Sequence, residues 1–260
     1  TVKRQSGLLR PHLNNSNLLG NSVTIPYFFA HSSNKDFTFT PTFYDENIQM
    51  FQTEYRQIGK NFNFITDIGF TRGYKSSTDN KKKNINHIFT NLNLNLDLDG
   101  YENSDLNLKI EKVSNDTYLK IFDSNIYTDT LKPENFNILK SEIILQLNSE
   151  KYNFETGFQS YENLTLSNND RYEYILPYYN YNKILSDNFM NGLINFASSG
   201  SNELKNTNNL RSKAVNDLSY NSLDLISKHG FKNNFNINFK NLISAGKNDS
   251  EYDSNPDLKI

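Results

Sequence analysis

Apolar and polar residues alternate along much of this chain, and this period of two is the feature that most limits its fold. Residues 91–99 read NLNLNLDLD, so leucines fall on one side of an extended strand and asparagines and aspartates on the other. A helix of the same sequence would spread leucine around its whole circumference. The alternation recurs at residues 106–110, 139–147 and 235–239. It predicts strands with one apolar and one polar face.

The predicted strands are long and widely spaced. About twelve of them fit into the chain, many with about ten to fourteen residues, whereas about five or six residues are usual in soluble sheets. A tilted strand that crosses a membrane needs about nine to eleven residues. Residues 116–135 are the least regular region and could hold a short helix or a long loop. The predicted strands are residues 21–30, 36–44, 48–58, 61–72, 84–98, 105–114, 138–149, 152–161, 171–184, 192–201, 211–222 and 231–245.

Strand length, alternation and spacing together favour an all-β fold, an antiparallel transmembrane β-barrel, over a soluble β-sandwich, which remains the alternative. No run approaches the roughly 18 apolar residues that a membrane helix needs, and mean hydropathy is −0.71. These values exclude a helical membrane protein. They are compatible with a barrel, because its strands present only alternate residues to lipid and its lumen is polar.

Composition excludes several kinds of function. The net charge is −2, so the basic face that nucleic-acid binding needs is not expected. There is no cysteine, which excludes disulfides and thiol catalysis. The histidines, His12, His31, His87 and His229, do not have the short spacing of metal ligands. No catalytic residue, metal site or cofactor is predicted, although a Ser–His–Asp site assembled across barrel strands, as in an outer-membrane hydrolase, stays open.

Two prolines are the most specific local signal. Pro26 and Pro41 lie near the middle of two successive strand-like runs, residues 23–30 and 36–44. Proline cannot donate a hydrogen bond to a β-ladder, so it marks an edge or weak pairing. One interpretation is that both prolines sit beside loops and have no further role. The other is that they mark a seam in the sheet that opens.

The sequence motifs around these prolines resemble the first barrel strands of the LptD family of outer-membrane lipopolysaccharide-assembly proteins. The likeness lies in SGLLRP at residues 6–11, IPYFFA at 25–30, NKDFTFTP at 34–41 and EYR at 54–56, and it is weaker beyond. Glu54 and Arg56 share one face of a strand, and a lumen-facing charge pair is favoured over a catalytic dyad. The positions that match the family's motifs are Gly7, Pro11, Tyr27, Phe28, Asp36, Glu54 and Arg56.

The resemblance implies a function as well as a fold. In that family a barrel of 26 strands follows a periplasmic β-jellyroll and encloses a plug lipoprotein, LptE. Lipopolysaccharide arrives from a periplasmic bridge protein and leaves sideways between the first and last strands, where prolines weaken the pairing. Pro26 and Pro41 occupy the matching places and are the expected lateral gate. The expected function is therefore lipopolysaccharide transport and insertion into the outer leaflet of the Gram-negative outer membrane, without enzymatic activity.

The chain also departs from the family pattern. The jellyroll is missing, about half of the strands are present, and the cysteines that link jellyroll to barrel in many members have no counterpart. Residues 1–260 are therefore expected to be the N-terminal half of the barrel domain, folded as an open, curved sheet. A passive porin-like channel and, less favoured, an outer-membrane hydrolase are the alternative functions.

Overall fold

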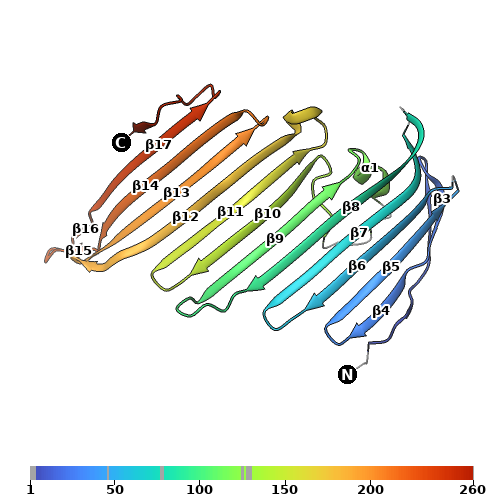
Figure 1. The fold of residues 1–260 in the computed structure, drawn as a ribbon. Coiled ribbons are helices and arrows are strands. Elements are labelled where there is room, and N and C mark those ends of the chain that lie inside the picture. Colours follow the sequence, from blue (N-terminus) through green and yellow to red (C-terminus); the bar gives the residue numbers. More distant parts are fainter. Residues whose placement is uncertain (1–3, 46, 77–78, 124–125, 127–130, 260) are drawn as a thin grey trace. The chain divides into compact units, whose positions relative to one another are not determined.

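The computed structural model of the protein describes residues 4–45, 47–76, 79–123, 126 and 131–259 (Figure 1). The chain divides into two compact units. Unit 1 comprises residues 1–94, 107–141 and 162–166, and unit 2 comprises residues 95–106, 142–161 and 167–260.

Strands make up nearly all of the regular structure, as the alternation predicts. The strands before residue 100 are β1 (Gly7–Leu8), β2 (His12–Ser16), β3 (Gly20–Thr24), β4 (Tyr27–Ser32), β5 (Lys35–Tyr44), β6 (Gln49–Ile58), β7 (Phe62–Ser76) and β8 (Asp79–Asn95). The later elements are β9 (Asn103–Val113), α1 (Tyr118–Phe122), β10 (Ile138–Asn148), β11 (Tyr152–Asn163), the 3-10 turn η2 (Asn168–Arg171), β12 (Tyr172–Phe189), β13 (Gly192–Lys205), β14 (Asn209–Ser222), β15 (Leu225–Ile226), β16 (Lys232–Asn233), β17 (Asn236–Lys247) and β18 (Asp257–Lys259).

Sixteen of these strands belong to one antiparallel sheet that is not closed, which fits part of a β-barrel. From β4 to β14 each strand pairs with the next in the sequence, β1 precedes β4, and β17 and β18 follow β14. β3 lies off this path and pairs with both β2 and β5, while β15 and β16 form a separate hairpin. The predicted fold class, an antiparallel all-β sheet belonging to a partial barrel, is confirmed.

Each predicted strand overlaps an observed one, and the differences have local causes. The strand predicted at residues 21–30 is divided into β3 and β4, because Pro26 interrupts it. The strand predicted at 231–245 begins only at Asn236, since part of the preceding stretch forms the β15–β16 hairpin. The irregular region, residues 116–135, contains the short helix α1.

In unit 1 the polar face of the sheet also carries the hydrophobic core. Buried residues alternate along β5 and β6, so that Thr40, Thr42 and Tyr44 face the same side as Met50 and Gln52. Helix α1 packs onto this side. The buried cluster includes Leu19, Tyr44, Ile48, Met50, Phe89, Tyr118, Leu119 and Phe122.

In unit 2 the two faces of the sheet also differ in polarity. Ser201 pairs with Lys213, and Glu203 with Arg211, so these four residues share the polar face. The opposite face carries exposed apolar side chains from neighbouring strands, such as Leu218, Phe239 and Ile243. In the part of the chain that the structure describes, no helix is long and apolar enough to cross a membrane.

Candidate functional site

The strand that carries Pro26 is interrupted at that residue. β3 pairs with β5 up to Thr24, and β4 resumes the pairing at Tyr27. Between them the backbone nitrogen of Ile25 donates a hydrogen bond to the carbonyl oxygen of Pro41, at 3.1 Å. The two predicted gate residues therefore lie on adjacent strands, one register position apart.

Pro41 removes one backbone hydrogen bond between β5 and the interrupted strand, which consists of β3 and β4. In an antiparallel pair, the N–H and C=O groups of one residue point to the same neighbouring strand. The carbonyl of Pro41 points to Ile25, so its nitrogen, which carries no hydrogen, points there too. A pair that normally makes two hydrogen bonds makes one here.

Pro26 has the same effect on the other side of its strand. Its carbonyl oxygen accepts a hydrogen bond from the nitrogen of Leu9, at 2.9 Å. Its own nitrogen carries no hydrogen and so donates no second hydrogen bond. Each proline thus removes one backbone hydrogen bond at the same level of the sheet. Pro41 removes one between β5 and the interrupted strand, and Pro26 removes one between that strand and the segment of Leu9. A net backbone hydrogen bond contributes about 0.5–1.5 kcal/mol, so each loss is modest and both act at the same place.

The β3 side of the interruption is firmly held. The hydroxyl groups of Thr24 and Thr42 lie 2.8 Å apart in a buried hydrogen bond between β3 and β5. At the start of β3, Asp45 accepts hydrogen bonds from the backbone and side chain of Asn21, at 2.9 and 2.8 Å. β2 adds five paired residues along the other edge of β3. This half of the strand has partners on both edges.

The β4 side pairs with β5 at five positions, against three for β3, but it has fewer partners on its outer edge. Only two residues of β1 pair with it, Gly7 opposite Phe28 and Leu8 opposite Tyr27. No residue of β4 is buried, and its pairing with β5 is irregular near its end. Three of the positions that match the LptD family, Gly7, Tyr27 and Phe28, therefore meet in this short contact. The β3 and β4 halves of the interrupted strand therefore differ in the pairing on their outer edge, with five residues of β2 against two of β1.

Three more motif positions form an ion-pair cluster on the polar face beside β4. Asp36 accepts a hydrogen bond from Arg56, at 2.8 Å, and another from Arg4, at 2.7 Å. Glu54 lies 3.4 Å from Arg56. The side chain of Asp36 is buried and the arginines are partly exposed. The predicted Glu54–Arg56 pair is present, and Asp36 lies closer to Arg56 than Glu54 does. Pro11 lies between β1 and β2.

The opposite face around Pro41 is aromatic. The rings of Phe29 and Phe37 stack with centroids 4.9 Å apart, and those of Phe39 and Phe51 with centroids 6.2 Å apart. Phe29 and Phe39 remain about two-fifths exposed. A contiguous exposed aromatic face on long strands suits contact with lipid acyl chains.

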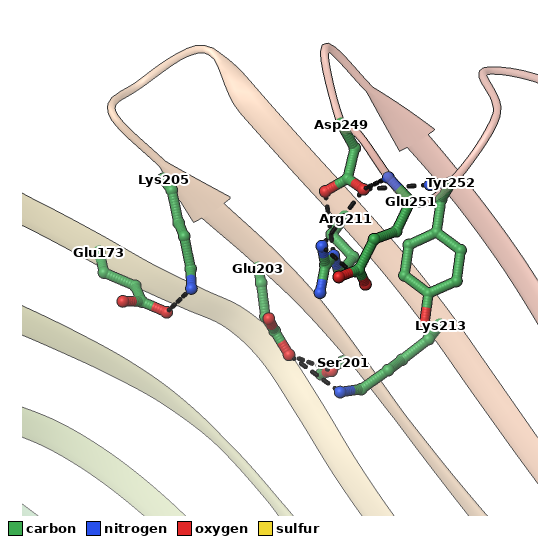
Figure 2. Close-up of polar contacts among 9 residues, drawn as sticks. All are labelled: Glu173, Ser201, Glu203, Lys205, Arg211, Lys213, Asp249, Glu251 and Tyr252. Atoms are coloured by element: carbon green, nitrogen blue, oxygen red, sulfur yellow. Dashed lines mark hydrogen bonds and ion pairs between the residues drawn. The ribbon is translucent and has the colours of Figure 1, made fainter. Parts of the chain in front are cut away.

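A second group of charges lies in unit 2, where β12, β13 and β14 run side by side (Figure 2). Lys205 lies 3.0 Å from Glu173, and Lys213 lies 3.1 Å from Glu203. Each pair joins neighbouring strands. These partly exposed pairs give the polar face both signs of charge.

The loop after β17 is bound to the start of β14, where Arg211 lies. Arg211 donates two hydrogen bonds to Asp249, at 3.0 and 3.2 Å, and its guanidinium group lies over the ring of Tyr252 (Figure 2). Asp249 also accepts hydrogen bonds from the backbone nitrogens of Glu251 and Tyr252. The Arg211 hydrogen bonds, followed by those from the backbone, hold the pKa of the Asp249 carboxyl below its ordinary value.

A cavity of about 490 Å³ lies against the sheet of unit 2. Its lining includes the amide groups of Gln146, Asn148, Asn180 and Asn182 and the hydroxyl group of Ser199. The lining also includes the charged side chains of Glu155, Asp217 and Lys240, so hydrogen-bonding amides stand beside both signs of charge. This surface suits a hydrated or hydroxyl-rich solute.

The described residues include no group of three or more His, Asp or Glu side chains that could hold a metal ion. His87 is buried, with its ring nitrogens next to Tyr118 and Asp67. Sequence reasoning did not find this chain of side chains, because Tyr118 lies 31 residues away in an irregular region. It also missed the β2–β3 hairpin, although Gly20, with φ of +72°, is a turn signal there.

No protein-family model matches this chain. A stretch of 127 residues is 32% identical to LPS-assembly protein LptD of Idiomarina loihiensis. This stretch covers 47% of this chain and 15% of that protein. A stretch of 128 residues is 29% identical to LPS-assembly protein LptD of Pseudoalteromonas translucida, and it covers 49% of this chain and 16% of that protein.

The matched stretch therefore spans less than a fifth of the length of these curated relatives and about half of this chain. Over this stretch the chain is distantly similar to LptD, and its long antiparallel strands in an unclosed sheet are consistent with that similarity.

Proposed function

We propose that this chain forms part of the barrel wall of an LptD-like translocon, which inserts lipopolysaccharide into the outer leaflet of the Gram-negative outer membrane. The observation that carries the proposal is the coincidence of two missing backbone donors, at Pro26 and Pro41, on both edges of one strand path. A wall that only separates two compartments gains nothing from such weakening, whereas a wall that lipids must cross needs it.

The two faces of the sheet support a physical mechanism. The aromatic face around Phe39 and Phe51 accommodates acyl chains, while the ion pairs and amides of the opposite faces accommodate the hydrated sugar portion. Lipopolysaccharide would move its sugar along the polar side and its acyl chains through the weakened seam. No covalent bond forms or breaks in this process, so the protein acts as a transporter without enzymatic chemistry.

The partners follow from the resemblance to the LptD family. They are lipopolysaccharide itself, an LptE-like plug lipoprotein within the barrel, a periplasmic bridge protein that reaches the barrel through a jellyroll domain, and the lipids of the outer membrane. The similarity of half of the chain to two LPS-assembly proteins supports these assignments.

Replacement of both prolines tests the function in cells. Pro26→Val and Pro41→Val together, in the full protein, supply two N–H donors while keeping a residue that suits strands. We expect slower appearance of newly made lipopolysaccharide at the cell surface. Pro256→Val, at an exposed loop proline before β18, is the matched control and leaves export unchanged. Unchanged export in the double variant, at normal protein abundance, would favour a passive porin-like channel instead.

A further inference from the structure

The β15–β16 hairpin exposes large apolar side chains at one end of the strands of unit 2 (Figure 1). It belongs to the connection between β14 and β17 and forms a two-stranded sheet of its own. Leu223 is 65% exposed, Ile226 72% and Phe231 69%. A hairpin of two strands is only marginally stable in water, and apolar side chains gathered on a surface mark a place of interaction. The hairpin therefore needs a surface to lie on.

The two sides of the hairpin differ in character. Ile226 pairs with Lys232, and the amino group of Lys232 lies 2.7 Å from the carboxylate of Asp224. The ladder continues to Phe231, whose carbonyl oxygen accepts a hydrogen bond from the opposite strand. Because successive side chains of a strand point to opposite sides, Leu225 and Phe231 share one side. The other side carries Ile226 and the ion pair.

The apolar face of the sheet in unit 2 runs directly into the hairpin. The backbone nitrogen of Ser222 donates a hydrogen bond to the carbonyl oxygen of Phe235 at 2.9 Å, which continues the register of β14 and β17. Phe235, Ile237 and Phe239 alternate along this path, and each is more than half exposed. They share the face that carries Leu218, the partner of Phe239. The exposed apolar face thus extends past the strand ends.

The tip of the hairpin is basic. Gly230, with φ of +81°, turns the chain, and Lys228 and His229 stand just before it. The charge of Lys232 is balanced by Asp224, whereas Lys228 has no ion pair among the residues that the structure describes. An apolar stem that ends in an unbalanced cation is the arrangement with which side chains span the boundary between acyl chains and headgroups.

We propose that the β15–β16 hairpin is an anchor in the interfacial layer of the membrane. Leu225 and Phe231 lie at the boundary of the acyl chains, and Lys228 binds the phosphate group of an anionic lipid. Such a segment binds through its buried apolar area together with the attraction between lysine and anionic headgroups. The unbroken apolar surface from Phe239 to the hairpin favours lipid over a protein partner. This inference rests on the proposed function, in which the sheet is a membrane wall, and adds a lipid-binding site at one end of it.

The position of the hairpin is tested by fluorescence quenching in the full protein. An environment-sensitive fluorescent amino acid would replace Phe231, with the protein in vesicles of equal parts phosphatidylcholine and phosphatidylglycerol. Nitroxide groups near the headgroup end of the acyl chains should quench it, and iodide in the water should have little effect. The matched control carries the same label at Phe239, on the apolar face of β17, where lipid nitroxides should also quench.

The two positions separate failure of the anchor from failure of the wall. Quenching at position 231 by iodide alone, with position 239 quenched by lipid, would overturn the anchor and leave the membrane wall standing. Absence of lipid quenching at both positions would contradict the wall itself, and with it the proposed function.

The role of Lys228 is tested by moving the nitroxide from one lipid to the other at a constant total amount. Quenching at position 231 should show an enrichment of phosphatidylglycerol over phosphatidylcholine of up to about five-fold, the effect of one lysine close to anionic headgroups. Lys228→Gln should abolish this enrichment. Lys60→Gln, at an exposed position between β6 and β7, is the matched control and should keep it. Equal quenching by both lipids before substitution, or loss of the enrichment in both variants, would overturn phosphate binding by Lys228.

Discussion

The nitrogen of Ile25 donates a hydrogen bond to the carbonyl oxygen of Pro41 at 3.1 Å, and Pro41 has no hydrogen with which to return it. Pro41→Val would place an N–H group in that direction. We expect the new amide at position 41 to be protected from exchange, and the amide of Ile25 to exchange about three- to ten-fold more slowly. Native-state hydrogen exchange in detergent measures both. An unprotected amide at position 41 would show that this pair is open for a reason other than proline.

The buried carboxylate of Asp36 holds two arginines, Arg4 and Arg56. Asp36→Asn keeps the shape and removes the charge, so the two arginines lose their shared carboxylate and one of its two acceptor oxygens. We expect a loss of about 1–2 kcal/mol in the free energy of unfolding, because both arginines are partly solvated and their pairing is screened. Denaturant unfolding measures this. Asp257→Asn, at an exposed position in β18, is the control and should change little.

Gly69 leaves the space that the His87 ring occupies. Gly69→Ala would force the ring to move and would break its hydrogen bond with Tyr118. We expect a destabilisation of about 1–3 kcal/mol, the usual cost of overpacking a core. Gly7→Ala is the matched control, since a Cβ atom there meets nothing within 4 Å. Equal unfolding free energies for the two variants would contradict the tight seat inferred for His87.

The loop after β17 should respond to acid through Asp249. Because its carboxyl pKa is lowered in the folded protein, its contribution to stability is fully present above the ordinary value of about 3.9 and is lost as pH falls through the lowered pKa. The amide resonances of Glu251 and Tyr252, which donate to Asp249, should titrate with a midpoint below about 3.9.

Arg211→Gln is the matching variant, since it removes the first cause of the shift while keeping a polar side chain. In this variant the midpoint of the Asp249 titration should rise toward the ordinary value. A midpoint that is the same in both proteins would show that the backbone donors alone set the pKa.

The sequence predicts the strands well because their signal is local. The alternation in NLNLNLDLD fixes which side chains share a face, and β8 contains most of it. The prolines mark the interruption between β3 and β4 because a missing donor is a property of a single residue. Asp36, Glu54 and Arg56 come from two strands, and the pairing of those strands brings them together.

The buried chain of Tyr118, His87 and Asp67 could not be predicted in the same way. Its members come from a helix and two strands, and no period or spacing in the sequence relates them. The short strand β1 was also missed, because its two residues form a strand only where β4 offers an edge. Both features depend on tertiary contacts and leave no local pattern.

Time-resolved photo-cross-linking tests the central claim most directly. A photoreactive phenylalanine analogue would replace Phe39, on the aromatic face beside the seam, or Phe158, an exposed residue of β11 in unit 2. After a short pulse of labelled lipopolysaccharide, the account predicts that position 39 captures the label first and that position 158 captures it only later. Simultaneous capture at both positions, or earlier capture at position 158, would contradict export through the seam at Pro26 and Pro41.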